Sequence, residues 1–162
     1  MTRRYGRSPI GQRLTCPVPH GHYQTTTLIA ALRLKGPQAP WLFGGAMDGE
    51  LFLAWVKQGL VLCLQPDDVV VMDNLGSHYA PEALAAIEAA GAHALFLPPY
   101  SPDWNPIGKA WFMFKNILRR IKARSPEALR RAIRRAWSTL KKSNLAPVFD
   151  HCGYGSSKAQ PN

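Results

Sequence analysis

The sequence predicts a single α/β domain, built as a small mixed sheet flanked by helices. Two observations lead to this prediction. The expected segments follow the order hairpin, helix, strand, helix, strand, helix, helix, which packs helices against one small sheet. Of the 162 residues, 46% are hydrophobic, and no internal repeat or long linker divides them. We therefore expect one domain over residues 1–150 and a C-terminal tail over residues 151–162.

Turn residues and β-branched runs define the elements of the first half. Glycines and prolines punctuate residues 1–20, which predicts a loop. Residues 23–32 are rich in β-branched side chains and predict a strand, paired antiparallel with a short strand at residues 39–43. Residues 50–64 are apolar at helical spacing. The expected buried face of this helix consists of Leu51, Phe52, Trp55, Leu60 and Cys63.

The middle of the chain predicts a strand, a helix and a second strand. Residues 69–72 are an unbroken apolar run, typical of a strand that is buried on both faces at the centre of a parallel sheet. A helix is expected to begin at Pro81, which suits the first helical position, and to stop before Gly91, which suits the position after the last turn. Residues 93–97 predict another short strand, followed by a proline-rich loop.

Two further helices are predicted in the last third. Asn105 can cap the first helix and Pro106 can occupy its first position. Ser125 begins the second helix, and no periodicity follows Asn144. The apolar side chains of each helix recur at spacings of three and four residues, as one buried face requires. These faces are Ile107, Trp111, Phe114, Leu118 and Ile121 in the first helix, and Leu129, Ile133, Trp137 and Leu140 in the second.

The charge of the chain points to a polyanionic partner. Twenty Lys and Arg residues face 10 Asp and Glu residues, which gives a formal net charge of +10. From Lys109 to Lys142, twelve residues are basic and only Glu127 is acidic. A bias of this kind is typical of a protein that binds nucleic acid. The alternative is a solvated basic surface that keeps the protein in solution.

The composition argues against a membrane protein and against a protein whose cysteines bind a metal ion. The chain has no apolar run of roughly 18 residues, the length that would predict a spanning helix. Its basic N-terminus lacks the apolar stretch of a signal peptide. We therefore expect a cytoplasmic protein without a membrane partner. Cys16, Cys63 and Cys152 are odd in number and far apart, so we expect reduced, partly buried thiols.

Asp73 is the strongest single candidate for chemistry. It directly follows the apolar run at residues 69–72, and ligand sites in α/β sheets lie at the carboxyl ends of the strands. A carboxylate there suits a hard divalent cation such as Mg²⁺. The alternative is that Asp73 and Asn74 simply begin a turn.

The sequence segments around Asp73 resemble the catalytic domain of mariner-superfamily insertion-sequence transposases, which are DDE superfamily endonucleases. The resemblance rests on VVVMDNLGSH at residues 69–78 and on LFLPPYSPDWNPIGKAW at residues 95–111. Bacterial members typically carry a strand ending in MDN-x-x-x-H and a later LPPYSPDLNPIE. The stretch VPHGHYQTTTLIAAL at residues 18–32 is similar to their second strand. The resemblance covers nearly the whole chain, about residues 7–155.

The resemblance implies a ribonuclease H-like fold and metal-dependent cleavage and transfer of DNA strands. It also implies three carboxylates, two Asp and one Glu, that hold two Mg²⁺ or Mn²⁺ ions. Asp73 matches the second aspartate. Thirty-four residues then lead to Gly108, which occupies the position of the family's glutamate. The first aspartate would end a strand upstream of Tyr23, where the chain has no acidic residue.

This mapping predicts an N-terminally truncated, catalytically impaired copy of such a domain. In the family's fold the first strand lies between the second and the fourth. Its loss would leave two strands with unpaired edges that face each other. We therefore expect a domain that folds poorly, aggregates or borrows a strand from a partner.

Other residues are candidates to contribute to the site. Asp48 and Glu50, near the start of the first helix, could bind metal, although a helix cap and a first-turn acid are the simpler interpretation. His20 and His22 lack the further ligands that zinc requires. His78 either contacts phosphate or is an ordinary loop histidine.

Three functional interpretations follow. The first is an impaired transposase-family protein that retains affinity for DNA. The second is a remnant without catalysis that binds DNA or associates with itself, and so modulates a full-length transposase. The third is the second half of a frameshifted transposase, whose upstream frame supplies the first aspartate. The residues expected to contact DNA are Lys109, Lys115, Arg119, Arg120, Arg130, Arg131, Arg134 and Arg135.

Overall fold

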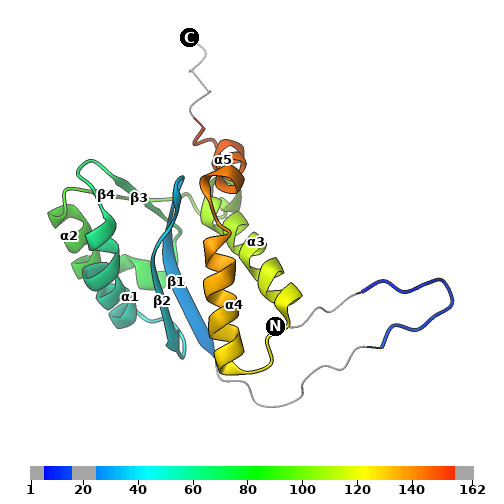
Figure 1. Ribbon diagram of the computed structural model, residues 1–162. Helices are drawn as coiled ribbons and strands as arrows, with labels where there is room; N and C mark the ends of the chain where they lie inside the picture. Colours follow the sequence, from blue (N-terminus) through cyan, green and yellow to red (C-terminus); the bar gives the residue numbers. More distant parts are fainter. Residues whose placement is uncertain (1–5, 16–24, 156–162) are drawn as a thin grey trace, which may run out of the picture.

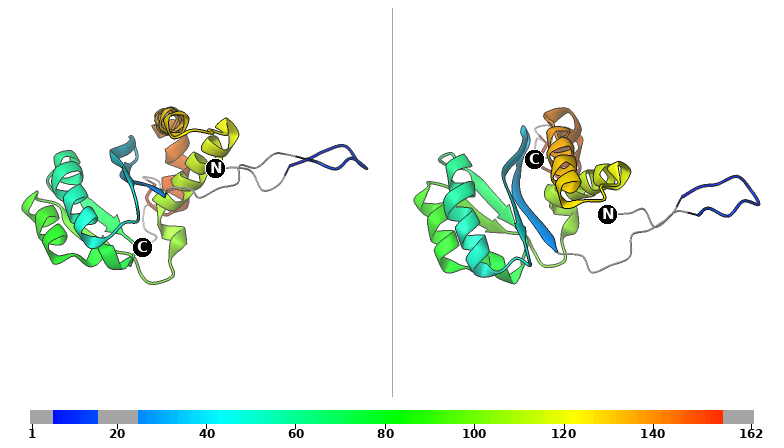
Figure 2. Two further views of the ribbon diagram at one scale, coloured as in Figure 1. Left: turned by 90° about the horizontal axis from the view of Figure 1, so that it is seen from below. Right: turned by 60° about the horizontal axis from the view of Figure 1, so that its bottom comes forward.

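The computed structural model describes residues 6–15 and 25–155. Its strands lie between two groups of helices, with α1 and α2 on one side and α3, α4 and α5 on the other (Figures 1 and 2). The α/β class predicted from the sequence is confirmed. No helix in the described ranges is long and apolar enough to span a membrane. The elements are β1 (Thr26–Arg33), β2 (Gly36–Gly44), α1 (Gly49–Trp55), β3 (Val69–Met72), α2 (Pro81–Ala89), β4 (His93–Phe96), α3 (Pro106–Ile121), α4 (Pro126–Ser138) and α5 (Lys142–His151).

The antiparallel hairpin of β1 and β2 is confirmed, and β2 is longer than predicted. Its register pairs Thr26 with Gly44 and Arg33 with Gly36. The register shifts between Ile29 and Ala31, opposite Pro40, because a proline lacks the N–H that a regular ladder needs. The first two residues of the strand predicted over 23–32 lie outside the described residues.

The predicted parallel pair is also present, as β3 and β4. Val69 lies opposite His93 and Met72 lies opposite Phe96. The connection between them is α2, which begins at Pro81 as expected. Gly91 follows the helix with a positive φ of 79°, a conformation in which a side chain would be strained. The prediction of this strand–helix–strand unit is therefore confirmed.

The two strand pairs do not form one sheet. Within the described part of the chain, β1 is hydrogen-bonded only to β2, and β3 only to β4. The prediction of a single mixed sheet is wrong in this respect. The two pairs are tied at one end, where the Arg33 guanidinium of β1 donates to the Asp68 carboxylate beside β3. One edge of β1 and one edge of β3 are thus left without a strand partner.

The core on the α1 side is built mainly from large side chains, with Ala83 and Ala92 also buried in it. Phe52, Trp55, Val56 and Leu60 are buried there, together with Ile87 of α2. The helix predicted over residues 50–64 is present, although its hydrogen-bonding pattern changes along its length. After α1 it continues as a π-helical segment (Val56–Leu60) and ends in a 3₁₀ turn (Val61–Cys63).

The second core, on the α3 side, is built around small side chains. Ala110 of α3 and Ala132 and Ala136 of α4 are buried, and Leu28 and Leu32 of β1 pack against this core. The larger members are Phe114, Leu118, Leu140 and Leu145. The predicted apolar faces of α3 and α4 are inward at most positions, with alanines among them. The prediction that Ile121 lies on the buried face of α3 is wrong, because Ile121 is 36% exposed at the last residue of the helix.

Two sequence expectations are corrected. Residues after Asn144 are not irregular, because α5 extends to His151 in spite of Pro147 inside it. The strand β3 is not buried on both faces, since Val69 is 55% exposed and Leu95, opposite Val71 in β4, is 52% exposed. The physical reason is that the second core packs against β1 and leaves this face of the β3–β4 pair uncovered.

Candidate functional site

Asp73 lies where the sequence predicts it, immediately after the last residue of β3. Its side chain is 57% exposed and pairs with the imidazole of His78, with 2.9 Å between Oδ1 and Nδ1. The backbone N–H of Leu75 donates to the same carboxylate oxygen at 3.3 Å. The carboxylate is thus oriented by its own loop while most of its surface remains open to solvent.

His78 is brought together with Asp73 by the turn that follows β3. Its side chain is 19% exposed, and its ring lies 4.8 Å from the ring of Phe52, which is buried in α1. Its Nδ1 also lies 3.2 Å from the backbone oxygen of Asp73. The first core therefore holds the imidazole against the carboxylate. The sequence allows two interpretations of His78, a phosphate contact or an ordinary loop histidine. Neither of them predicts the pairing with the Asp73 carboxylate that the structure shows.

A small network joins the loops that follow β3 and β4. The Asn74 side chain donates to the backbone oxygen of Leu97 at 2.6 Å, and the hydroxyl of Tyr79 donates to the Asn74 side-chain oxygen. The ring of Tyr79 stacks on Phe96 of β4, with 4.5 Å between centroids and an interplanar angle of 3°. Sequence reasoning missed Tyr79 and Asn74. The signal that could have identified Tyr79 is that an aromatic residue lies in the turn that follows Asp73.

Gly108 lies in the first turn of α3, and the frame around it is intact. The Asn105 side chain accepts a hydrogen bond from the backbone N–H of Ile107 at 3.2 Å, which confirms the predicted cap. A Cβ built on Gly108 meets no atom within 4 Å. The first side-chain carbon of a larger residue would therefore meet no neighbour at this position.

The side chains that the structure describes do not form a Mg²⁺ site. Among residues 6–15 and 25–155, no group of three or more His, Cys, Asp or Glu side chains is placed to hold a metal ion. Two clustered dications require several carboxylate oxygens. Asp73 is the one acid of the expected set that the described residues supply, because position 108 is a glycine. His20 and His22 lie outside the described residues.

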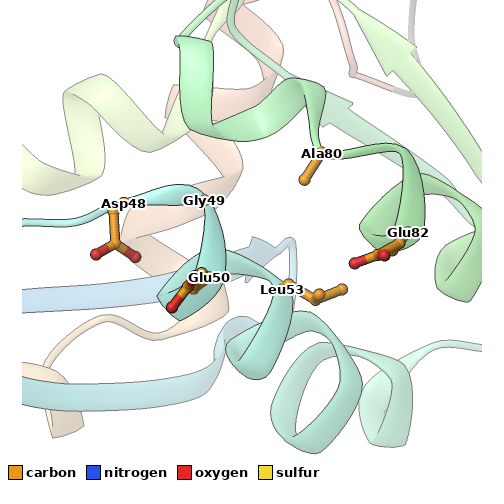
Figure 3. A pocket seen from close by; sticks show the side chains of 6 residues that line it. All are labelled: Asp48, Gly49, Glu50, Leu53, Ala80 and Glu82. Carbon is orange, nitrogen blue, oxygen red and sulfur yellow. The ribbon is translucent and has the colours of Figure 1, made fainter.

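The acidic residues at the start of α1 line a separate pocket of about 460 Å³ with Glu82 of α2. Figure 3 shows that the carboxylates of Asp48 and Glu50 point away from that of Glu82. The Asp48 side chain accepts a hydrogen bond from the backbone N–H of Leu51 at 2.8 Å. This contact confirms the simpler interpretation, in which Asp48 is a helix cap.

The basic residues expected to contact DNA lie on α3 and α4. The four arginines of α4 are exposed and, within the described ranges, engage in no ion pair. Their spacing of one and four residues places them on one side of the helix. On α3, Lys115 and Arg120 are exposed, whereas Lys109 and Arg119 are partly buried. The α4 residues are Arg130, Arg131, Arg134 and Arg135, named below the α4 arginine face.

The cysteines are consistent with structural thiols. Cys63 is partly buried, Cys152 is buried, and both are free. Burial raises the pKa of the Cys152 thiol, so the reactive thiolate is disfavoured there. Cys16 lies outside the described residues.

Comparison with known proteins adds one finding. Residues 1–130 match the sequence profile of a family described as DDE superfamily endonuclease. The matched region includes Asp73, Gly108 and the whole of α3, and it ends within α4. No curated protein matches the chain.

Proposed function

Since the chain belongs to the DDE superfamily endonucleases, we propose that it is a transposase-family protein that binds DNA without cutting it on its own. The observation that carries this proposal is the family match combined with a single acid, Asp73, in the described donor set. In this family, metal ions offset the negative charge that gathers on the phosphoryl oxygens during strand transfer. The residues present do not fit such a centre, so Asp73 and His78 are left to contact DNA rather than to cleave it.

We interpret the two strand pairs as outer parts of one ribonuclease H-like sheet of the mariner type. The unpaired edges of β1 and β3 support this interpretation. So does the Arg33–Asp68 contact, because a long side chain links the start of β3 to the end of β1. The family's first aspartate would belong to a strand between these edges, and among residues 6–15 and 25–155 no strand occupies that place.

Cleavage is tested with the purified chain and DNA that carries inverted repeats, in Mg²⁺ or Mn²⁺. We expect no nicking by the wild-type protein or by Gly108→Glu, because each still lacks the first acid. The matched control is an active member of the family on the same DNA. Metal-dependent nicking that Asp73→Ala abolishes would contradict the proposed loss of catalysis.

DNA binding is proposed to use the α4 arginine face. Each phosphate contact adds about 0.9 to the slope of log affinity against log salt. Replacing all four arginines with Gln should lower that slope by up to about 3.6 and reduce affinity at low salt by roughly 100-fold or more. Binding should be largely independent of sequence, because phosphate contacts do not distinguish bases.

The control for this test removes the same charge elsewhere. Four exposed cations outside α3 and α4 are replaced with Gln, so that the net charge falls equally. Equal loss of affinity in the two variants would mean that net charge, rather than α4, carries the binding. The control residues are Arg7, Arg13, Lys35 and Lys57.

A second function, self-association, is favoured by the unpaired edges of β1 and β3. Unprotected strand edges are templates for pairing with another chain. A copy that associates in this way could modulate a full-length transposase. Sedimentation of the purified protein should give a dimer or larger species at micromolar concentration, and a monomer with a cooperative two-state melt would contradict this function.

A further inference from the structure

Tyr79 presents a supported aromatic ring at the edge that carries Asp73. One face of the ring stacks on Phe96, with an interplanar angle of 3°. Its hydroxyl is held by Asn74, whose amide is held in turn by the backbone of Leu97. Yet Tyr79 is 48% exposed. The ring is therefore fixed from one side and from its tip while much of its surface faces solvent.

The position of Tyr79 relates it to the charged pair. It belongs to the same turn as Asp73 and follows His78 directly. The turn is anchored at three points, by the Asp73–His78 pair, by the Phe52 ring under His78, and by the stack of Tyr79 on Phe96. A ring held in this way loses little conformational freedom when a ligand covers its free surface.

We propose that the exposed face of Tyr79 stacks on an unpaired nucleobase of DNA bound at the Asp73 edge. This inference rests on the proposed DNA-binding function and adds the class of group that the edge recognises. A base in single-stranded DNA has a free π face, whereas a base inside a duplex is already stacked. The nucleobase would be the third ring in the stack formed by Phe96 and Tyr79. The positive charge of the chain, +10, would hold the DNA backbone nearby.

The test compares two DNAs in EDTA, so that binding is measured without metal. One is a short blunt duplex, and the other is the same duplex with a short single-stranded overhang that carries 2-aminopurine as its first unpaired base. The variants are Tyr79→Leu, which removes the ring, and Tyr79→Phe, which keeps it. Tyr154→Leu is the matched control, because Tyr154 is 44% exposed, donates one hydroxyl bond and contacts Phe149 edge-on instead of stacking.

We expect the wild-type protein to prefer the overhang DNA and to quench 2-aminopurine fluorescence. Tyr79→Leu should lose roughly 5- to 150-fold in affinity for the overhang DNA, the effect of one stacked base, and should bind the blunt duplex as before. Tyr79→Phe and Tyr154→Leu should behave like the wild type.

Several outcomes would overturn the proposal. They are equal affinity of the wild-type protein for both DNAs, an overhang preference that survives in Tyr79→Leu, and equal losses in Tyr79→Phe and Tyr79→Leu. If Tyr79→Leu fails to fold, the proposal is tested by the 2-aminopurine fluorescence with the wild-type protein. Fluorescence that is not quenched would mean that no stack forms. Failure of the wild-type protein to bind either DNA at low salt would instead reject the proposed function itself.

Discussion

The two cores of this domain differ in the size of the side chains that fill them. The core beside α1 is built mainly from Phe52, Trp55, Leu60 and other large residues, together with the alanines Ala83 and Ala92. The core beneath α3 and α4 has alanines at its centre, among them Ala132 and Ala136. Large side chains fill the space between irregular elements, whereas small ones let two helices approach closely.

The difference corresponds to what each half presents to solvent. The first core supports the turn of Asp73, since the Phe52 ring lies against His78. The second core carries the α4 arginine face on the opposite side of its buried alanines. One core therefore fixes individual polar groups in place, and the other displays a charged surface. Three experiments test this contrast, in order of expected effect.

The largest effect is expected for Phe52→Ala. Phe52 is 2% exposed, and removing such a ring leaves a cavity that costs about 3–5 kcal/mol of unfolding free energy. Because the ring also supports His78, the variant should alter the NMR signals of that imidazole. Urea unfolding and histidine NMR measure the two effects.

Phe114→Ala is the matched control in the second core, where Phe114 is also 2% exposed. It should destabilise the protein to a similar extent and leave the His78 signals unchanged. Equal perturbation of His78 by both variants would show that the two cores are not distinct in function.

A smaller effect is expected for Ala136→Leu. Ala136 is fully buried between the helices, so a larger side chain would force them apart at a cost of about 1–3 kcal/mol. Ala85→Leu, at an exposed position of α2, should change the unfolding free energy by less than about 0.5 kcal/mol. Equal stability of both variants in urea would mean that the second core is loosely packed.

The elements best predicted from sequence are those whose signals are local. Prolines and caps set the starts of α2, α3 and α4, and Asn105 and Ser125 accept the expected backbone hydrogen bonds. The position of Asp73 followed from a short apolar run that ends in an acid. The intact frame around Gly108 was predictable for the same reason, because cap and apolar stripe lie within one helix.

The features that were missed depend on contacts between distant segments. The helix α5 has no strong stripe and contains Pro147, so that its formation depends on burying Leu145 against the second core. The separation of the two strand pairs is a property of pairing across the chain, which periodicity does not report. The stack of Tyr79 on Phe96 joins residues on two elements, and neither residue signals it alone.

The smallest effect concerns the Arg33–Asp68 pair, which ties the two strand pairs together. The hydrogen bond from Arg33 is the main cause that lowers the pKa of Asp68, and the backbone N–H of Gln65 is the second. A lowered folded pKa means that the pair stabilises the fold above the unfolded pKa, about 3.9. That stability is lost as pH falls through the lower, folded pKa.

Arg33→Gln removes the main cause of this shift, so its unfolding free energy should fall less than that of the wild type as the pH drops below about 4. The side chains of Arg33 and Asp68 are 34% and 21% exposed, and an ion pair near the surface contributes about 1 kcal/mol or less. Urea unfolding between about pH 3 and 7 measures the difference, with Asp68→Asn as the variant in which the titrating group is absent. Parallel pH profiles for Arg33→Gln and the wild type would mean that the link between the strand pairs is not electrostatic. Packing on the two faces of β1 would still join the two cores, since Ile29 packs on the first core and Leu28 on the second.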